Sequence, residues 1–409
     1  MKTISLCLAL AGSTNLLYAQ QKPSDSIARK LDEVIVTGQY EPQSVRKSVY
    51  QVRTINSKTI QSRAATSIQQ VLNTELGIRF SNDMALGTSD IQLMGMSGRN
   101  VKILLDGVPM IDRGETRESL NQIDVNTIER IEIVEGPMSV SYGTDALAGV
   151  INIITKKPGT EKILVTAKIQ EESAGSEYQT FSNEGIHNQN INISWQKKAW
   201  NVSAGFSHNN FEGWQGDTTG RVKQWHPKNQ LLGNAKVGYT TGNFNIYYRL
   251  DALNEDIKAN GGQIESPLYD NPIARDKKYT TNRFTNQIQS NWLINRKLNL
   301  SFLASYTNYK RKTQTTVLDL VTNTRTLSID AAEQDVSKFN SAIFRTTAQY
   351  KVSDKLSLQP GLDLNMESAS GQRIAGSPSI NDYAFFVSAE IKPLSFINIR
   401  PGLRFIYNS

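Results

Sequence analysis

Alternation of apolar and polar residues with a period of two dominates the chain after Pro158, in segments of about ten residues. One segment contains Ile191, Ile193 and Trp195, and another runs over residues 244–250. Successive side chains of a β-strand point to opposite faces, so each segment predicts a strand with one apolar and one polar face. Strands that cross a bilayer between lipid and a polar lumen have this pattern at this length.

Connections between the segments alternate between short polar turns and long loops. The short turns are Lys197-Lys198, Thr241-Gly242, Asn295–Lys297, Ser353–Lys355 and Pro393-Leu394. The long loops, rich in Gly, Asn, Asp and Thr, cover 209–226, 253–278, 310–335 and 367–380. This alternation is typical of an up-and-down outer-membrane barrel.

We count about eleven strands between residues 161 and 409, and the last pattern stops inside a strand. Open sheet edges cannot satisfy their backbone groups in lipid, and single-chain bacterial barrels have even strand numbers. We therefore expect a truncated barrel. The stretch Leu356–Leu362 recurs as Ile397–Leu403, and we expect a β-bulge at the Pro-Gly of each copy, Pro360 and Pro401.

Composition divides the chain near Lys157-Pro158. All five tryptophans, 12 of the 13 phenylalanines and 11 of the 15 tyrosines lie beyond this point. We predict that 159–409 form a partial transmembrane β-barrel and that 41–158 form a separate mixed α+β domain. The net charge is +7, but the 45 basic and 38 acidic residues are interspersed, which disfavours a nucleic-acid partner.

Residues 1–19 have the pattern of a secretory signal peptide. Lys2 supplies the positive charge, Ile4–Leu17 is mostly apolar, and Ala19 is a small residue for cleavage. The apolar run is too short to span a membrane as a helix. Cys7 is the only cysteine, so its removal leaves no thiol for disulfides, zinc or catalysis. The sequence therefore predicts export.

Residues 20–40 form a polar arm that carries one short β-prone segment. The segment consists of Asp32, Glu33, Val34, Ile35, Val36, Thr37 and Gly38. A strand isolated in a loose arm suits pairing with the exposed sheet edge of a partner through main-chain hydrogen bonds.

Four further elements are predicted between 41 and 158. Thr66–Asn73 has the signals of a short capped helix. Val101–Pro109 is a buried strand that ends in an Asp-Gly turn, Ile128–Pro137 is a strand with alternating charges, and Ser141–Thr155 is a turn followed by a β-rich run. The glycines permit turns or close backbone approach.

These residues resemble the TonB-dependent outer-membrane receptor family along the whole chain. Asp32–Gly38 resembles the TonB box. The plug signatures of the family are matched, in order, by Leu105–Pro109, Glu135–Pro137, Tyr142-Gly143 and Gly149–Thr155. Met94 and Glu135 depart from the family, which commonly has Arg at both positions, and this puts in doubt any plug–barrel salt bridge made by those arginines.

The resemblance implies a barrel of 22 strands whose lumen holds the plug, with about eleven strands present here. It also implies that substrate binds to apical plug loops, that the TonB box becomes exposed, and that the inner-membrane TonB complex pulls on it. The loops 81–90 and 110–118 are the apical candidates, and the expected substrate contacts are Asn82, Asp83, Met84, Asp112, Arg113, Glu115 and Arg117. Structural roles in the plug are expected for Asp106, Gly107, Glu135, Gly136, Pro137, Tyr142, Gly143 and Gly149.

Catalysis and metal binding find no support in the sequence. The three histidines (His187, His208 and His226) lack metal-ligand spacing, and no Gly-x-Ser-x-Gly elbow occurs. Acidic residues assigned to long loops could bind calcium, but their spacing is not diagnostic. These residues are Asp217, Glu255, Asp256 and Asp270. We expect no enzyme activity, no cofactor and no bound metal.

The favoured function is TonB-dependent import of a ferric siderophore, cobalamin or haem across the outer membrane of a Gram-negative bacterium. A passive porin or surface adhesin needs neither a TonB box nor a plug, so residues 32–158 disfavour that class. A signalling receptor needs a further periplasmic domain, for which residues 20–31 are too short. Carbohydrate import with a surface lipoprotein remains an alternative, and the missing loops leave the substrate open.

Overall fold

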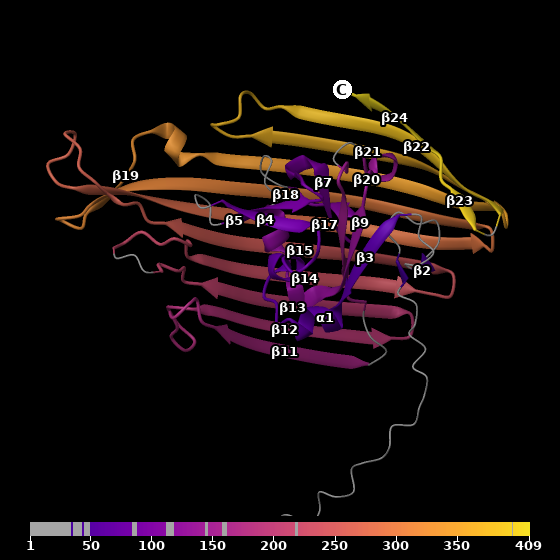
Figure 1. Ribbon diagram of the computed structural model, residues 1–409, viewed down its shortest axis with the longest axis horizontal. Coiled ribbons are helices and arrows are strands. Elements are labelled where there is room, and N and C mark those ends of the chain that lie inside the picture. The colour runs from indigo at the N-terminus through magenta and orange to yellow at the C-terminus, as the bar shows by residue number, and fades with distance from the viewer. Residues whose placement is uncertain are drawn as a thin grey trace, which may run out of the picture.

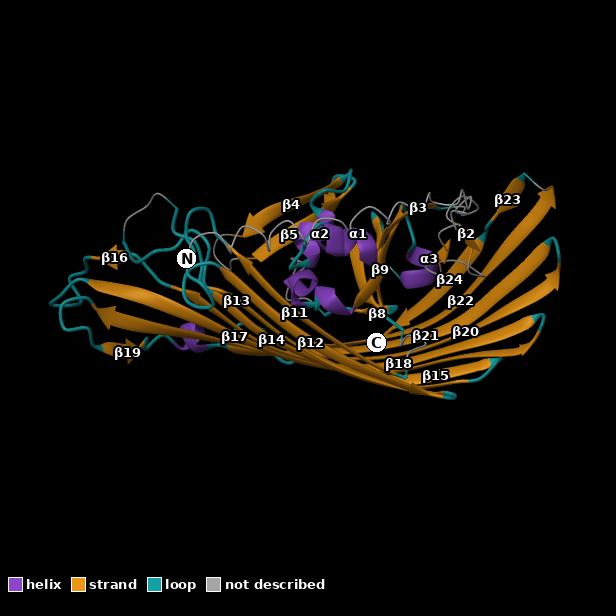
Figure 2. Cartoon of the chain, turned by 90° about the horizontal axis from the view of Figure 1, so that it is seen from below, coloured by secondary structure: helices purple, strands orange, loops and turns teal. Residues whose placement is uncertain are grey.

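The computed structural model describes residues 34–35, 43–44, 50–83, 88–111, 118–143, 146–157, 162–216, 220–394 and 396–409. A large curved sheet forms a trough, and a smaller α+β unit lies on its concave side (Figures 1 and 2). We call residues 162–409 the wall and residues 50–157 the plug. The signal peptide and most of the arm lie outside the described residues.

The wall is an antiparallel sheet in which consecutive long strands pair. Its strands are β11 (Ile163–Glu172), β12 (Ile186–Lys197), β13 (Trp200–Phe211), β14 (Lys228–Thr240), β15 (Phe244–Ala259), β17 (Ile273–Asn295), β18 (Leu298–Asp319), β20 (Val336–Ser353), β21 (Leu356–Ser370), β22 (Ser379–Leu394), β23 (Ile397–Ile399) and β24 (Gly402–Asn408). Two short strands, β16 (Gln263–Ile264) and β19 (Arg325–Leu327), pair with β17 and β18. Both β23 and β24 pair with β22, so they form one interrupted strand and the wall has the expected eleven.

Four of the five predicted short turns are confirmed, and they lie at one end of the wall (Figure 1). The fifth is wrong in position, because Pro393 and Leu394 are the last residues of β22. Two of the predicted long loops are wrong in extent. β17 begins at Ile273 and β18 continues to Asp319, well inside the expected loops 253–278 and 310–335. These outer halves are polar on both faces, so the apolar alternation stops before the strands end.

The expected bulges at Pro360 and Pro401 are also wrong. β21 pairs with β22 in one continuous register through Pro360. On either side of Pro401 the pairs Ile391↔Ile399 and Ser388↔Gly402 keep the same register. Proline removes one ladder donor at each site, but the strand continues in line because no residue is inserted.

The two faces of the wall differ in polarity. On β17, Phe284, Ile288 and Trp292 are exposed on the convex face, at 49%, 42% and 47% of their surface. Their neighbours Thr285 and Gln287 are buried on the concave face. The predicted alternation is therefore confirmed, with polar side chains toward the plug. Among the described residues no helix is both long and apolar enough to cross a membrane.

The plug is built around a five-stranded sheet of order β3-β9-β10-β7-β8. These strands are β3 (Gln51–Asn56), β7 (Val101–Leu105), β8 (Val108–Pro109), β9 (Ile128–Glu135) and β10 (Gly149–Thr155), and β7 and β10 are parallel. Their Val, Ile and Leu side chains pack with α1 (Ser57–Ser62) and α2 (Ile68–Leu72) in one buried cluster. The helix predicted at Thr66–Asn73 is confirmed as α2, which is capped by Ser67; α1, capped by Asn56, was not predicted.

A second, three-stranded sheet of the plug consists of β4 (Ile78–Asp83), β5 (Thr88–Leu93) and β6 (Met96–Ser97). In Figure 1 the β4–β5 hairpin lies toward the end of the wall that carries the long connections. In the arm, β1 (Val34–Ile35) pairs with β2 (Gln43–Ser44), and β2 lies toward the end with the short turns. The β4–β5 hairpin of the plug and the arm strand β2 thus lie toward opposite rims of the wall.

Candidate functional site

The predicted TonB box is described only at its centre. Val34 and Ile35 form β1 and pair antiparallel with Ser44 and Gln43. The other five residues of the box lie outside the described residues; they are Asp32, Glu33, Val36, Thr37 and Gly38. Among the described strands β1 pairs with β2 alone, so its second edge carries no described neighbour.

The first apical candidate is the tip of the β4–β5 hairpin. Asn82 and Asp83 end β4 and pair with Ser89 and Thr88. Met84 and the rest of the tip to residue 87 lie outside the described residues. The described part of the hairpin lies toward the rim with the long connections (Figure 1).

The second apical candidate falls in the gap at 112–117, so Asp112, Arg113, Glu115 and Arg117 are not described. The structure describes the chain on either side of it, with β8 ending at Pro109 and a 3-10 helix beginning at Glu118. The two ends of this loop are thus anchored to the plug core and, through Gln122, to the wall.

The Asp-Gly turn after β7 is fixed by hydrogen bonds to β10. Asp106 and Gly107 both have positive φ, +50° and +83°. The Asp106 carboxylate accepts hydrogen bonds from the Thr155 amide (2.8 Å) and hydroxyl (2.6 Å). The Gly107 amide donates to Oδ1 of Asn152 (3.1 Å), and Gln289 of the wall donates to the Asp106 carbonyl (2.6 Å). One turn thereby joins two plug strands to the wall.

Glycine is required at Gly149, where β10 passes β9. Its φ is +147°, and a Cβ there would lie 2.2 Å from the carbonyl oxygen of Val134. Gly136 also has positive φ (+95°), but a Cβ there would meet no atom within 4 Å. Its amide donates to the Ala148 carbonyl (3.0 Å), and Pro137 follows it before the chain turns into α3 (Ser139–Tyr142).

Glu135 occupies a position where arginine is common in the resembled family, and it forms an ion pair inside the plug. Nη2 of Arg53 on β3 lies 2.6 Å from its carboxylate. A second carboxylate, on Glu75, lies 3.5 Å from the same arginine. Met94, at the other departure, is exposed in the turn between β5 and β6. The described contact of Glu135 is therefore within the plug rather than with the wall.

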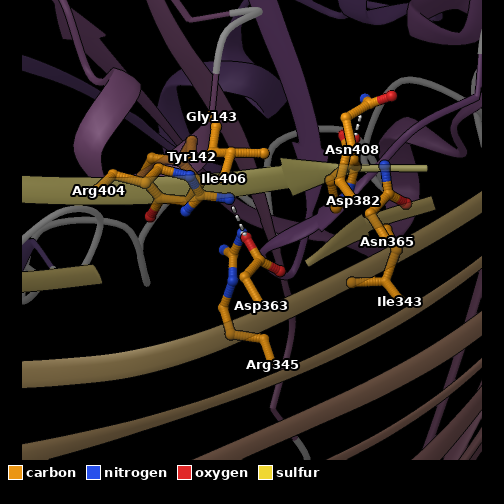
Figure 3. A pocket seen from close by; sticks show the side chains of 11 residues that line it. Tyr142, Gly143, Ile343, Arg345, Asp363, Asn365, Asp382, Arg404, Ile406 and Asn408 are labelled. Carbon is orange, nitrogen blue, oxygen red and sulfur yellow. Dashed lines mark hydrogen bonds and ion pairs between the residues drawn. The ribbon is translucent and has the colours of Figure 1, made fainter. Parts of the chain in front are cut away.

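Tyr142 and Gly143 line a cavity of about 140 Å³ between plug and wall (Figure 3). The guanidinium of Arg345 lies over the Tyr142 ring, 5.5 Å from its centroid. Asp363 bridges two wall arginines, at 2.6 Å from Arg345 and 2.9 Å from Arg404. This cavity is too small for a nutrient chelate, so we assign it to the packing of the plug against the wall.

A buried polar network joins the plug to the outer part of the wall. Gln122 donates to Oε1 of Glu255 (2.8 Å) and accepts from Arg283 through its side-chain oxygen (3.0 Å) and its main-chain oxygen (2.7 Å). Gln230 donates to the other oxygen of Glu255 and to the Asn121 carbonyl. Gln122, Glu255 and Gln230 are each 3% exposed. Their polar groups cannot hydrogen-bond to water, so they are satisfied by one another.

Asp124 makes a second buried junction. Its carboxylate accepts from the hydroxyl of Ser207 on β13 (2.6 Å) and caps the Asn126 amide (2.9 Å). Lys156 donates to the Asn126 carbonyl (2.8 Å). Burial lowers the pKa of the Lys156 ammonium, and the charge of Asp124 partly opposes that shift. A single carboxylate thus orders the plug and holds it to the wall.

The residues considered for calcium are separated in the structure. Glu255 is on β15 within the network above, and Asp256 points the other way and pairs with Lys278 (3.1 Å). Asp270 is exposed in a loop, and Asp217 lies outside the described residues. Within the described part of the chain, no group of three or more His, Cys, Asp or Glu side chains could hold a metal ion. Of the histidines, His187 is buried against Glu171 (2.6 Å).

Sequence reasoning missed the plug–wall network. Gln122 and Glu255 are 133 residues apart, and Gln122 and Arg283 are 161 apart. Only a polar residue at a concave-face strand position could have indicated the wall partners, and Glu255 had been assigned to the loop 253–278.

Comparison with known proteins finds relatives of this chain. The model of the TonB-dependent receptor plug domain matches residues 44–150. The chain is 30% identical over 195 residues to the vitamin B12 transporter BtuB of Vibrio vulnificus, covering 46% of this chain and 31% of that protein. It is 26% identical over 233 residues to the ferric enterobactin receptor of Pseudomonas aeruginosa, covering 50% and 30%.

Solved structures share the fold. The siderophore receptor PirA from Acinetobacter baumannii aligns with a TM-score of 0.70 at 18% identity, over 92% of this chain and 58% of that one. A variant of the ferric enterobactin receptor PfeA from Pseudomonas aeruginosa aligns with a TM-score of 0.65 at 16% identity, over 92% and 59%. The chain thus spans under a third of these curated relatives in sequence, and under three fifths of these structures.

Proposed function

We propose that the protein is a TonB-dependent receptor that imports a scarce nutrient across the outer membrane with energy delivered by TonB. The proposal is supported by the match of residues 44–150 to the plug-domain model and by the similarity to BtuB. The proposed substrates are a ferric siderophore, cobalamin or haem, the classes that the sequence favours. The proposed partners are TonB with its inner-membrane complex, and outer-membrane lipid. Relatives with this plug are named as transporters and receptors, and we infer that this protein likewise has no catalytic activity.

One observation carries the proposal: the plug is held against the polar face of a wall whose other face is apolar. Contacts at Asp106, Gln122 and Asp124 attach the plug to β13, β15 and β17. A passive pore gains nothing from a domain attached across its lumen. An importer needs one, because the lumen must stay closed until substrate has bound.

The arrangement of the plug supports a direction of signalling. Substrate would contact Asn82, Asp83 and Met84 at the hairpin tip and the loop at 112–117, near the rim with the long connections. The box at 32–38 precedes β3 in the sequence, and β2, the strand that pairs with its centre β1, lies on the side of the short turns (Figure 1). We infer that TonB adds a strand to β1, whose second edge carries no described neighbour, and pulls the plug through that main-chain pairing.

The remaining signature residues have positioning roles in this proposal. Asp106 and Gly107 form the turn that couples β7 to β10, and Gly149 permits the close approach of β9. Tyr142 and Gly143 seat the plug beside Arg345, while Glu135 to Pro137 shape the turn after β9. Force applied at the arm would reach the hairpin through these fixed strands.

Deleting residues 32–38 from the full-length protein tests the proposal. Cells limited for iron, haem or cobalamin would be compared for binding and uptake of each labelled nutrient. We expect one nutrient to bind normally but to enter no faster than in cells lacking the protein. The matched control deletes seven arm residues outside the box, 24–30, and retains uptake. Unchanged uptake of every candidate in the box deletion would contradict energised import.

A further inference from the structure

Three long connections of the wall meet at one short stretch of β17. The connections are residues 212–227 between β13 and β14, 260–272 between β15 and β17, and 320–335 between β18 and β20. The stretch is Arg275-Asp276, close to the start of β17. The short strands β16 and β19, which belong to two of these connections, lie at the same end of the wall in Figure 2. Connections that are far apart in the sequence are therefore held at one place on the rim.

The Asp276 carboxylate contacts groups from all three connections. Arg221, in the first connection, donates to both of its oxygens (2.6 and 2.9 Å). The amide of Gly261, in the second, donates to Oδ1 of Asp276 (3.1 Å), and the Gly261 carbonyl accepts from Arg221 (2.7 Å). Nη1 of Arg325, on β19 in the third, lies 3.0 Å from Oδ2. We call Asp276 and these three residues the rim clasp.

The third connection is held on both faces of the wall. Arg275 and Asp276 are successive strand residues, so their side chains point to opposite faces. Asp276 shares the convex face with Phe284, because the register of β17 is continuous between them. On the concave side, Arg275 donates to both oxygens of Glu333 (3.0 Å each). Arg325 and Glu333 of one connection therefore contact the wall from opposite sides.

Burial makes the rim clasp stronger than an ordinary surface ion pair. Asp276 is 5% exposed, and removing a donor from a buried carboxylate leaves an uncompensated charge, which is strongly destabilising. Its bidentate bond with Arg221 has the charge-assisted geometry that is both strong and directional. By contrast, Asp354 at a short turn is 95% exposed beside Lys351, and exposed pairs of this kind contribute little. The three connections are thus coupled through one carboxylate.

We propose that Asp276 is a positioning residue for substrate capture, and that the rim clasp holds the three connections in their binding conformation before substrate arrives. This inference rests on the proposed function, in which substrate enters at this rim. Connections that are already ordered need not be ordered by the substrate, and this raises the affinity for it. Asp276 is covered by the connections and acts through them, so its effect is on binding rather than on the later transport step.

Binding and uptake by the full-length protein separate these two steps. The probes are labelled ferric enterobactin, cyanocobalamin and haemin. Asp276→Asn keeps the shape of the side chain but removes its charge. With the binding-competent fraction lowered to about a tenth, the apparent Kd should rise about tenfold. The uptake rate at saturating probe should change by less than about twofold, because excess probe restores the competent state. The matched control, Asp354→Asn, should change neither quantity.

A disulfide gives a sharper test because it can replace the rim clasp. A Cβ at Gly262 would lie 3.7 Å from Cγ2 of Val222, so cysteines at these two positions are close enough to bridge. The bridge joins the first two connections without Asp276. In the Asp276→Asn protein, the oxidised Val222→Cys/Gly262→Cys pair should restore the affinity to within about threefold of the wild type, and reduction should remove the gain. An Asp276 that contacted substrate directly would not be replaced by this bridge.

Three results would overturn the inference. They are an unchanged affinity of Asp276→Asn for a probe that the wild type binds, an equal loss in Asp354→Asn, and a bridge that restores nothing. A wild type that binds none of the three probes would contradict the proposed function, and the inference with it. Should Asp276→Asn fail to fold, Arg325→Gln removes one ion pair only and should raise the apparent Kd about threefold. An unchanged Kd in that variant would equally overturn the inference.

Discussion

Arg283 of the wall donates two hydrogen bonds to Gln122 of the plug, one to the side-chain oxygen (3.0 Å) and one to the main-chain oxygen (2.7 Å). The same glutamine donates to Glu255 (2.8 Å), so a neutral side chain separates two buried opposite charges. Each charge loses its plug partner if Gln122 leaves. Withdrawing Gln122 therefore breaks hydrogen bonds to two buried charged groups. It does not separate an ion pair, because the Gln122 side chain is neutral.

Gln122→Ala should loosen the plug. It leaves Arg283 and Glu255 short of one buried partner each, a cost of about 1–3 kcal/mol. Hydrogen exchange of the β7 amides, 101–105, should accelerate in the full-length variant while the wall amides keep their protection. Gln61→Ala, at an exposed position of α1, should change exchange by less than about 0.5 kcal/mol. Equal protection in both variants would show that the network does not hold the plug.

Asp106 should tolerate asparagine better than alanine. Asp106→Ala loses both hydrogen bonds from Thr155 and should lower the free energy of unfolding of the plug by about 3 kcal/mol. Asp106→Asn keeps one acceptor oxygen and suits the positive φ, so the loss should be about 1 kcal/mol. Urea unfolding of the full-length protein, followed by exchange of plug amides, measures both. Identical losses would mean that the acceptor oxygen retained by asparagine contributes nothing.

Gly149→Ala should cost more than Gly136→Ala. Both positions have positive φ, and alanine there is strained by about 1–3 kcal/mol. Gly149→Ala adds a clash with the Val134 carbonyl at 2.2 Å, whereas Gly136 has open space. The plug midpoint in urea should therefore fall further for Gly149→Ala, by at least about 1 kcal/mol. The reverse order would show that the close approach of β9 and β10 is adjustable.

The fold could be predicted where one physical signal dominates. The apolar convex face and polar concave face of the wall require strict alternation, so the segments around Ile191 and Phe244 and four of the five short turns were predicted correctly. The outer halves of β17 and β18 lie beyond the apolar band, where both faces are polar, and they were taken for loops. The bulge predicted at Pro360 was wrong because a proline can occupy a position in a strand without an extra residue being inserted.

The candidate site was predictable in its local parts. Asp106, Gly107 and Gly149 take part in turns and close contacts that short sequence patterns encode. The partners of Gln122 and Asp124 could not be predicted, because they are joined only when the plug meets the wall. Asn82 and Asp83 were expected in a loop but are the last residues of strand β4, next to the hairpin tip, and their contact with substrate is a proposal.

Lipid-dependent quenching along β17 tests the central claim most directly, namely that one face of the wall meets lipid and the other meets the plug. Single cysteines would replace convex-face residues (Phe284, Ile288 and Trp292) or concave-face residues (Thr285, Gln287 and Gln289) in a full-length mature protein without other cysteines. Each cysteine would carry a small fluorophore. In vesicles of brominated lipid the account predicts strong quenching at 284, 288 and 292 and little at 285, 287 and 289. Equal quenching in the two sets, or a protein that stays folded in water without lipid or detergent, would contradict it.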